Sequence, residues 1–313
     1  MKKIFNFAVI GGSGYVAEKH YIAIKKTGNK IIAVYDPVDN IGVLDKYEIT
    51  SLYFNNFQNF KKFIKNSKGT SMQIDYLTIC SPNYLHFKHI QLGLKNNLKI
   101  ICEKPLLINM THLNYLLRKQ KTQNLNINLI LQLRFHPIYK ELNNFIKHNS
   151  RKKYKVNLTY LAPRGNWYSK SWKSISSKSG GIASNIGIHL FDILINFFGK
   201  VLNYKVYYRS NKTMIGYLEL ENAEIDWILS TDYLLCKDNK PTRKINFLKK
   251  EFNLSASQKD LHHISYNNIL NNKGFTINES IDSLKLVNKL NKIKTFKKNP
   301  FTEFNNIKIN AIK

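Results

Sequence analysis

The chain is short of cysteine, and it lacks a long apolar run. Only three cysteines occur in 313 residues, at Cys80, Cys102 and Cys236. Their small number and wide spacing exclude a disulfide framework and a zinc cluster, so we expect no metal and a reducing, cytoplasmic location. No apolar stretch approaches the roughly 18 residues of a membrane helix, so the sequence predicts no transmembrane segment.

Acidic residues and arginine are also scarce. The chain has 20 Asp and Glu against 49 Lys and Arg, a formal net charge of +29, yet only six of the cations are arginine. A charge of this size is typical of nucleic-acid binding, but the lysines are spread along the chain and no zinc finger, RNP-type strand or long basic region occurs. We therefore expect no nucleic-acid partner. The basic surface would still attract an anionic small substrate.

The remaining composition suits a globular protein. The length allows two domains or one large one, and 43% of the residues are hydrophobic. The first apolar run, Phe5–Ile10, leads straight into glycines. This favours a buried strand over a signal peptide.

Strand and helix patterns alternate through the first half of the chain. The predicted strands are Phe5–Ile10, Lys30–Tyr35, Asp75–Ile79, Lys99–Cys102 and Ile127–Leu133. Helical periodicity is found at Ala17–Lys26, Phe57–Ile64, His86–Leu94 and Leu113–Leu117, and a helix to about His148 follows. The alternation predicts an α/β fold with a doubly wound parallel sheet, and we assign residues 1–135 to a dinucleotide-binding Rossmann domain.

A glycine motif lies between the first predicted strand and helix. Gly12, Gly14 and Ala17 fit G-x-G-x-x-A, and Asp36 ends the next strand, 22 residues after Gly14. Gly12 would permit the tight turn, and Gly14 would let a pyrophosphate approach the helix N-terminus. Asp36 would bind the ribose hydroxyls and repel a 2′-phosphate, which favours NAD over NADP. The predicted cofactor residues of this segment are Gly12, Ser13, Gly14, Tyr15, Val16 and Asp36.

Further polar residues follow the carboxyl ends of predicted strands, where open α/β sheets bind ligands. Pro105 biases Lys104 toward an extended backbone, so the lysine side chain can project from its strand end. Arg134 is expected to face the substrate, either in direct contact or as support. The expected cofactor-binding residues of these segments are Ser81, Asn83, His86, Glu103, Lys104 and Gln132.

The pattern changes after Arg151. Strands are predicted at Tyr154–Leu161 and near Val201–Tyr208, Met214–Leu220, Glu224–Thr231 and Arg243–Phe247, and the last four have no helix between them. This indicates an antiparallel sheet. Helices near Leu261–Leu270 and Ile277–Leu290 close the chain, and we assign residues 136–313 to a second domain.

Between the first and second of these strands, two glycines open an amphipathic stretch, Ser179–Asp192. Its apolar residues recur at helical spacing and form one stripe: Ile186, Leu190, Ile193, Leu194 and Phe197. A helix would stack Asn185, His189 and Asp192 on another face, because they are spaced i, i+4 and i+7. These three groups form either one wall of a site or a hydrogen-bonded surface.

The chain resembles the glucose–fructose oxidoreductase and inositol dehydrogenase (Gfo/Idh/MocA) family over nearly its whole length. The motifs that carry the resemblance are Gly12-x-Gly14-x-x-Ala17, Ser81-Pro82-Asn83, Glu103-Lys104-Pro105, and Gly180-Gly181 with His189 and Asp192. The resemblance implies a Rossmann domain and a C-terminal α/β domain, at 136–313, with an open antiparallel sheet for substrate binding and oligomerisation. It also implies a nicotinamide cofactor, a sugar or polyol substrate, and a homotetramer or homodimer.

A narrower resemblance concerns three segments, Leu131–Pro137, Arg164–Lys173 and Ser179–Asp192. They are similar to the UDP-N-acetyl-2-amino-2-deoxyglucuronate 3-dehydrogenases of bacterial O-antigen and lipopolysaccharide synthesis. The resemblance implies NAD-dependent oxidation of C3 of UDP-GlcNAcA to a ketone, with 2-oxoglutarate as a possible co-substrate that recycles NADH. Many family members have Asp where this chain has Asn185, and the nucleotide-sugar branch has Asn.

Oxidation of a secondary alcohol requires a proton acceptor, and His189 has a suitable intrinsic pKa. Lys104 would position the hydroxyl and stabilise negative charge on oxygen, although the two roles could be reversed. Together Lys104 and His189 are the expected catalytic pair, and we expect them to meet over the nicotinamide ring.

The remaining predicted site residues would bind substrate. Arg164 would grip the uronate carboxylate or a phosphate, and Asn185 a sugar hydroxyl. Asp192 would orient His189 or bond the backbone. The other residues, which would stack on or contact the sugar nucleotide or pack the loop, are Trp167, Tyr168, Trp172 and Lys173.

Two other functions remain open from the sequence. One is a dehydrogenase of a free sugar or polyol on the same fold, which would need no diphosphate and uracil pocket in the Arg164–Lys173 loop. The other is a non-catalytic dinucleotide-binding sensor, against which the presence of both Lys104 and His189 argues.

Overall fold

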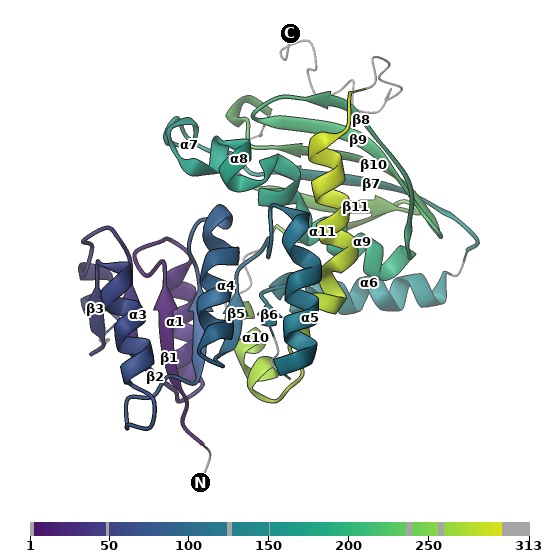
Figure 1. Ribbon diagram of the computed structural model, residues 1–313. Helices are drawn as coiled ribbons and strands as arrows, with labels where there is room; N and C mark the ends of the chain where they lie inside the picture. Colours follow the sequence, from purple (N-terminus) through teal and green to yellow (C-terminus); the bar gives the residue numbers. More distant parts are fainter. Residues whose placement is uncertain are drawn as a thin grey trace. The chain divides into compact units, whose positions relative to one another are not determined.

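The fold divides into two compact units (Figure 1). Unit 1 comprises Met1–Phe135 and Lys259–Ile281, and unit 2 comprises His136–Gln258 and Asp282–Lys313. The computed structural model describes residues 3–47, 50–123, 127–149, 151–235, 240–255 and 260–295. Cys236 lies outside the described residues, whereas Cys80 and Cys102 are buried free thiols.

Unit 1 is built on a seven-stranded sheet of order β13-β6-β5-β4-β1-β2-β3. Its strands are β1 (Asn6–Ile10), β2 (Lys30–Tyr35), β3 (Leu52–Phe54), β4 (Tyr76–Ile79), β5 (Lys99–Cys102), β6 (Ile127–Leu129) and β13 (Phe275–Thr276). All neighbours pair in parallel except β13, which runs antiparallel to β6. The predicted doubly wound parallel sheet is therefore confirmed.

Helices cover both faces of this sheet, with α3, α4 and α5 on one face and α1 and α10 on the other (Figure 1). The helices and short helical turns of unit 1 are α1 (Ala17–Lys26), α2 (Gly42–Lys46), α3 (Phe57–Asn66), η1 (Asn83–Leu85), α4 (His86–Lys95), η2 (Met110–His112), α5 (Leu113–Gln123), η3 (Gln132–Phe135) and α10 (Leu261–Leu270). The central strands are apolar and buried on both sides, as expected for a covered parallel sheet.

Residues 259–281 belong to unit 1, although the sequence analysis assigned 136–313 to the second domain. The aromatic side chain of Tyr266 on α10 is fully buried, and its ring centroid lies 5.9 Å from that of Phe7 in β1. An apolar helix stripe specifies that a helix packs, but it does not specify the partner. The predicted boundary was therefore wrong for this segment, and α11 (Ile277–Lys292) passes from unit 1 into unit 2 after Ile281.

Unit 2 is built on a six-stranded sheet of order β12-β11-β7-β10-β9-β8. Its strands are β7 (Tyr154–Leu161), β8 (Val201–Arg209), β9 (Thr213–Leu220), β10 (Ala223–Ser230), β11 (Thr242–Phe247) and β12 (Lys250–Asn253). The other elements are α6 (Pro137–His148), α7 (Trp167–Lys170), η4 (Trp172–Ser174), α8 (Ser176–Ser179), η5 (Ala183–Gly187), α9 (Ile188–Phe198) and η6 (Tyr233–Leu235).

The sheet of unit 2 is mostly antiparallel, with one parallel pair. β7 pairs in parallel with β10, because the chain crosses from one to the other through α7–α9 and the β8–β9 hairpin. The sequence analysis predicted an antiparallel sheet and missed this pair. α6, α9 and α11 lie on one face of the sheet (Figure 1). There Phe191 of α9 meets Trp227 of β10 edge to face, with ring centroids 5.3 Å apart.

Among the described residues, one helical stretch, Ser176–Phe198, is long and apolar enough to cross a membrane by length and composition alone. However, 72% of its most apolar window is buried inside the protein. The stretch is therefore a core helix of unit 2.

Candidate active site

The loop between β1 and α1 has the form of a dinucleotide-binding turn. Gly11, and not Gly12 as predicted, takes the left-handed conformation of the tight turn, with φ of +82°. Gly12 is required for a different reason, because a Cβ there would lie 2.2 Å from Cγ1 of Val34 and 2.6 Å from the hydroxyl of Tyr21. The nearest atom to a Cβ on Gly14 is the Gly11 carbonyl oxygen, at 3.3 Å.

Asp36 connects the end of β2 to this loop. Its Oδ2 accepts a hydrogen bond from the backbone N–H of Ser13 at 3.0 Å, and its Oδ1 accepts one from the N–H of Val38 at 3.0 Å. Asp36 is buried, with 8% of the residue exposed. The loop and the acid therefore hold each other in place, and each carboxylate oxygen keeps a further lone pair for a ribose hydroxyl.

The first turn of α1 suits an anion. Val16 occupies the position before the helix and has no side-chain oxygen to cap the first N–H groups. The N–H groups of Ala17 and Lys19 already donate to the carbonyls of Gly14 and Val16. The feature that favours a phosphate at this point is therefore the helix dipole. Tyr15, also predicted to bind the cofactor, is 79% exposed.

The two loops after β4 and β5 are tied together by His86. Its Nε2 lies 2.9 Å from the Ser81 carbonyl oxygen and its Nδ1 lies 2.8 Å from that of Pro105. The Ser81 hydroxyl lies 2.8 Å from Nδ1 of His89. His86 and Ser81 were predicted to bind the cofactor, but these atoms contact the protein itself. Their contribution would be to fix the loops around it.

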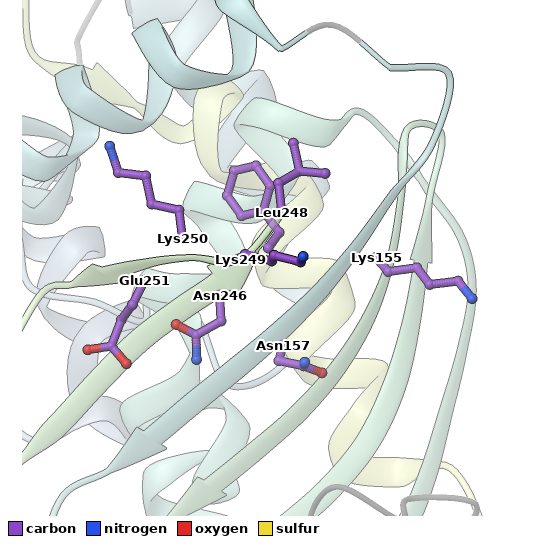
Figure 2. A pocket seen from close by; sticks show the side chains of 8 residues that line it. Lys155, Asn157, Asn246, Leu248, Lys249, Lys250 and Glu251 are labelled. Atoms are coloured by element: carbon purple, nitrogen blue, oxygen red, sulfur yellow. The ribbon is translucent and has the colours of Figure 1, made fainter.

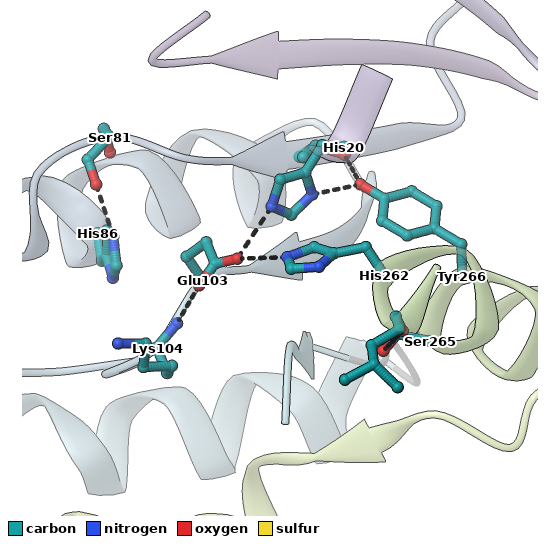
Figure 3. A network of polar contacts seen from close by, with 10 residues as sticks. His20, Ser81, His86, Glu103, Lys104, His262, Ser265 and Tyr266 are labelled. Atoms are coloured by element: carbon teal, nitrogen blue, oxygen red, sulfur yellow. Dashed lines mark hydrogen bonds and ion pairs between the residues drawn. The ribbon is translucent and has the colours of Figure 1, made fainter. Parts of the chain in front are cut away.

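Glu103 and Lys104 follow directly on β5. Glu103 is buried, and its carboxylate accepts hydrogen bonds from two histidines, His20 and His262, and from the backbone N–H of Lys104 (Figure 3). Lys104 is half-buried. The sequence analysis missed His20 and His262. The sequence signal that could have identified them is their position on the buried faces of the predicted helices Ala17–Lys26 and Leu261–Leu270.

The turn η3 after β6 carries Gln132 and Arg134. The side-chain oxygen Oε1 of Gln132 is buried and has no hydrogen-bond partner among the described residues. Such an acceptor is uncommon in a folded protein and fits a donor supplied by a ligand. Arg134 donates to the Glu279 carbonyl oxygen at 3.0 Å and lies over the ring of Phe275. These contacts favour support over the substrate contact predicted for Arg134.

In unit 2, the predicted polar triad begins in a π-helical turn. η5 is a π-helix, and the α-helix α9 begins only at Ile188. The expectation of one continuous α-helix was therefore wrong, and π turns of this kind are frequent at functional sites. His189 and Asp192 are buried, and Oδ1 of Asp192 accepts a hydrogen bond from the Ser283 hydroxyl at 3.3 Å.

Gly180 and Gly181, just before this turn, both have left-handed backbones, with φ of 82° and 80°. A Cβ on Gly181 would lie 2.5 Å from Oδ1 of Asn291 in α11. The amide of Asn291 donates to the Gly180 carbonyl and to Oγ of Ser184. The glycine pair therefore lets α11 fix the start of the π turn.

The loop Arg164–Lys173 joins the triad through Tyr168. Nδ2 of Asn185 donates to the Tyr168 hydroxyl at 3.0 Å, and this hydroxyl donates to the Lys173 carbonyl at 3.2 Å. Tyr168 is buried, so it packs the loop, whereas Trp167 is 55% exposed. Trp172 and Trp167 both lie within 6 Å of the Lys173 ammonium group.

Two cations lie close together in this loop. Burial lowers the pKa of the Lys173 ammonium group, and the nearby Arg164 lowers it further. No carboxylate contributes to this pKa among the described residues. Paired cations of this kind attract a multiply charged anion.

A separate hollow in unit 2 does not carry the predicted site. It has a volume of about 400 Å³ and is lined by Lys155, Asn157 and residues 246–251 of the β11–β12 hairpin (Figure 2). Its side chains point in different directions, and two of its charges are already paired, Lys250 with Glu141 and Glu251 with Lys244. None of the predicted site residues lines it.

Comparison with known proteins agrees with this geometry. Residues 5–129 match the family model "Oxidoreductase family, NAD-binding Rossmann fold" (GFO_IDH_MocA), and residues 152–246 match "Oxidoreductase family, C-terminal alpha/beta domain". The chain is also 32% identical to the WlbA (WbpB) dehydrogenase from Thermus thermophilus. That match covers 95% of this chain and 98% of the other, with a TM-score of 0.90. The chain belongs to the Gfo/Idh/MocA oxidoreductase family.

Two further proteins are similar to this chain. The WlbA dehydrogenase from Bordetella pertussis, solved with NADH and UDP-GlcNAcA, is 16% identical with a TM-score of 0.75 over 93% of this chain and 95% of its own. It shows the fold alone. A curated relative, the uncharacterized oxidoreductase YgjR of Escherichia coli, is 31% identical over 80 residues, which is 22% of this chain and 24% of that protein.

The cofactor of this family fits the residues of unit 1. The domain is an NAD-binding Rossmann domain, and the Thermus protein was solved with NAD. The start of α1 would supply an anion site, the Asp36 carboxylate a ribose acceptor, and the buried Gln132 oxygen an amide acceptor. The protein is therefore an NAD-binding oxidoreductase.

Proposed function

We propose that the protein oxidises the C3 hydroxyl of UDP-N-acetylglucosaminuronate to the 3-keto sugar with NAD. The observation that carries this proposal is the likeness to the Thermus WlbA dehydrogenase, which was solved with NAD and UDP-GlcNAcA and matches 95% of this chain at 32% identity. A match of this length includes the loop and the helix that we expect to bind the substrate.

Lys104 and His189 are the residues that we propose for catalysis. NAD supplies the hydride acceptor at the substrate carbon. His189 would take the hydroxyl proton, and Lys104 would hold the hydroxyl and stabilise negative charge on its oxygen. The reverse assignment, with a desolvated lysine as base, remains the alternative.

The charge of the proposed substrate suits the Arg164–Lys173 loop. UDP-GlcNAcA carries a diphosphate and a carboxylate, and Arg164 and Lys173 are two neighbouring cations. Burial, and then repulsion by Arg164, lowers the Lys173 pKa. Arg164 would bind the uronate carboxylate or the diphosphate. Trp167, which is exposed, and Trp172 are available to stack on the sugar or the uracil ring, while Asn185 would contact a sugar hydroxyl.

The NADH formed would be recycled by 2-oxoglutarate. The same Thermus protein was solved with NAD and alpha-ketoglutarate. A small dicarboxylate would use the same cations as the uronate. We further propose that the reaction belongs to cytoplasmic synthesis of surface-polysaccharide precursors such as those of O-antigen, and that the protein is a homotetramer or homodimer.

The direct test uses the purified protein with UDP-GlcNAcA and 2-oxoglutarate. We expect 2-hydroxyglutarate and a 3-keto nucleotide sugar in equal amounts, detected by mass spectrometry. Free sugars and polyols such as glucose and myo-inositol are the comparison substrates. Turnover of these alone would favour the free-sugar dehydrogenase, and NAD binding without turnover of any of them would favour the sensor.

A further inference from the structure

A buried polar network in unit 1 surrounds the residue before Lys104 (Figure 3). Oε1 of Glu103 lies 3.0 Å from Nε2 of His20 on α1 and 3.2 Å from Nε2 of His262 on α10. Oε2 of Glu103 accepts from the backbone N–H of Lys104 at 3.3 Å. The three side chains are each at most 9% exposed. A buried carboxylate of this kind requires such partners.

The proton positions follow from the partners. A carboxylate only accepts, so Nε2 of both histidines carries the proton. Nδ1 of His20 lies 2.8 Å from the Tyr266 hydroxyl, which lies 3.0 Å from Oγ1 of Thr78. Burial lowers the pKa of His20, so its ring is neutral and Nδ1 accepts from Tyr266. Thr78 then donates to Tyr266, so the hydroxyl of Tyr266 both accepts and donates a hydrogen bond in the series Thr78, Tyr266, His20 and Glu103.

The network joins three separate segments. His20 lies one turn into the helix that follows the glycine loop, and Glu103 lies at the end of β5. His262 and Tyr266 stand four residues apart on α10, in the segment of Lys259–Ile281 that belongs to unit 1. The C-terminal segment thus supplies two of the side chains that fix the backbone at Lys104.

We propose that His262 and Tyr266 are positioning residues for Lys104. His262 holds Glu103 directly, and Tyr266 does so through His20. Glu103 in turn would hold the backbone N–H of Lys104 in the place from which the amine reaches the substrate. This inference rests on the proposed function, because it takes Lys104 to be a catalytic residue. The network would make α10 a necessary part of the active site.

A metal ion held by His20, Glu103 and His262 is the competing explanation, because one ligand atom from each lies within 4.8 Å of the others. A metal would require both Nε2 atoms to be unprotonated. The N–O separations of 3.0 and 3.2 Å are those of N–H···O hydrogen bonds and need no ion.

The test compares His262→Leu, His262→Gln and His263→Leu. The Gln amide restores an N–H donor near the position of Nε2. His263 is the neighbouring histidine, is only partly buried, and pairs with Asn267. It is the matched control. We expect His262→Leu to lower kcat about 10- to 100-fold with little change in NAD affinity, because a small displacement of a catalytic group is costly. His262→Gln should restore most of kcat, and His263→Leu should match wild type.

The pH profile provides a second readout. Hydrogen bonds from His20 and His262 help to hold the Glu103 pKa well below its usual range. Loss of one donor raises that pKa, so a second ionisation, below that of the general base, should enter the acid limb of kcat in His262→Leu and not in His262→Gln. The other titratable groups that the Glu103 charge influences are Cys80, Cys102, His86 and Tyr266.

A readout without substrate separates this inference from the proposed function. The rate of Lys104 acetylation by acetic anhydride, followed by peptide mass spectrometry, should change at least about threefold in His262→Leu only, because the amine is displaced. An unchanged rate and an unchanged kcat in His262→Leu would overturn the positioning role. If the wild-type protein contained one equivalent of metal and His262→Leu contained none, His20, Glu103 and His262 would be metal ligands and the proposed hydrogen-bonded network would be wrong. If the wild-type protein turned over none of the substrates, the proposed function would be wrong. The acetylation rate of Lys104 would still test whether His262 positions this lysine.

Discussion

The backbone N–H of Ser13 donates a hydrogen bond to Oδ2 of Asp36 across 3.0 Å. This bond connects the glycine loop, which would bind the pyrophosphate, to the acid that would bind the ribose. This one hydrogen bond therefore fixes the position of the loop relative to the carboxylate before a dinucleotide binds. Preorganisation of this kind lowers the entropic cost of binding.

Asp36→Ala should therefore weaken NAD binding and lessen discrimination against NADP. The variant loses the ribose acceptor and the anchor of the loop, and it no longer repels a 2′-phosphate. We expect about a tenfold or greater loss of NAD affinity, measured by calorimetry, since a hydrogen bond to a charged group contributes about 1.5–3 kcal/mol. Asp39→Ala, at an exposed acid three residues further on, is the control. An unchanged preference for NAD in Asp36→Ala would show that Asp36 does not touch the ribose.

Gly12→Ala should destabilise the protein by about 1–3 kcal/mol, the usual cost of overpacking. The new methyl group would lie 2.2 Å from Cγ1 of Val34. Urea unfolding measures the loss. The double variant with Val34→Ala should recover part of it, because the clashing methyl groups are removed. Gly42→Ala, where a Cβ meets nothing within 4 Å, should not lower the free energy of unfolding. Equal stability of Gly12→Ala and wild type would refute the close packing of the loop on β2.

His189→Ala should lower turnover about 10²- to 10⁴-fold with the fold intact, as expected for a lost general base. The measurement is the rate of NADH formation with UDP-GlcNAcA, together with circular dichroism for the fold. Lys104→Met should have an effect of the same order. Substitution of the residue that acts as the base should also remove its ionisation from the acid limb of the pH profile of kcat. Wild-type turnover in His189→Ala would exclude this histidine from the mechanism.

Arg164→Met should weaken substrate binding and stabilise the free protein. Arg164 contributes to the lowered pKa of Lys173. Because the folded-state pKa lies below that of the unfolded chain, the charged lysine destabilises the fold at neutral pH, and stability increases as pH rises from the folded to the unfolded value. Removal of Arg164 relieves part of this penalty, so Tm at pH 7 should rise slightly.

The substrate arm of this prediction compares two ligands. Loss of a guanidinium contact should raise the dissociation constant of UDP-GlcNAcA about tenfold or more. An equal loss for UDP-GlcNAc would place Arg164 at the diphosphate, and a loss confined to UDP-GlcNAcA would place it at the uronate. Lys170→Met, at an exposed lysine of the same loop, is the control. Unchanged affinity for both ligands in Arg164→Met would remove Arg164 from the substrate site.

The sequence predicted most strands of both sheets because their signals are local, but it missed the short strands β3, β12 and β13. The alternation of apolar strands and helices and the motif around Gly12 and Gly14 specify a Rossmann unit without knowledge of the rest of the chain. Several strand and helix bounds agree with the structure to the residue, including Lys99–Cys102 and Ala17–Lys26. The family resemblance supplied the cofactor, which the family models bear out.

The features that the sequence could not supply are long-range. Which unit α10 packs on depends on contacts of Tyr266 with β1, far away in the sequence, and not on the periodicity of the helix. The pairing of His20 and His262 on one carboxylate has the same origin. The π turn at Asn185 replaces an expected α-helix, because the sequence period does not distinguish a single π turn. Gly11 takes the positive φ that was attributed to Gly12, because two adjacent glycines give no sequence signal to choose between them.

The most direct test of the account follows the hydrogen at C3. UDP-GlcNAcA labelled with deuterium at C3 is incubated with the protein and NAD, and the nucleotides are analysed by mass spectrometry and NMR. The account predicts that the label moves to C4 of the nicotinamide ring and that the sugar becomes a 3-ketone. Label that stays on the sugar, while the protein binds NAD and UDP-GlcNAcA, would contradict it.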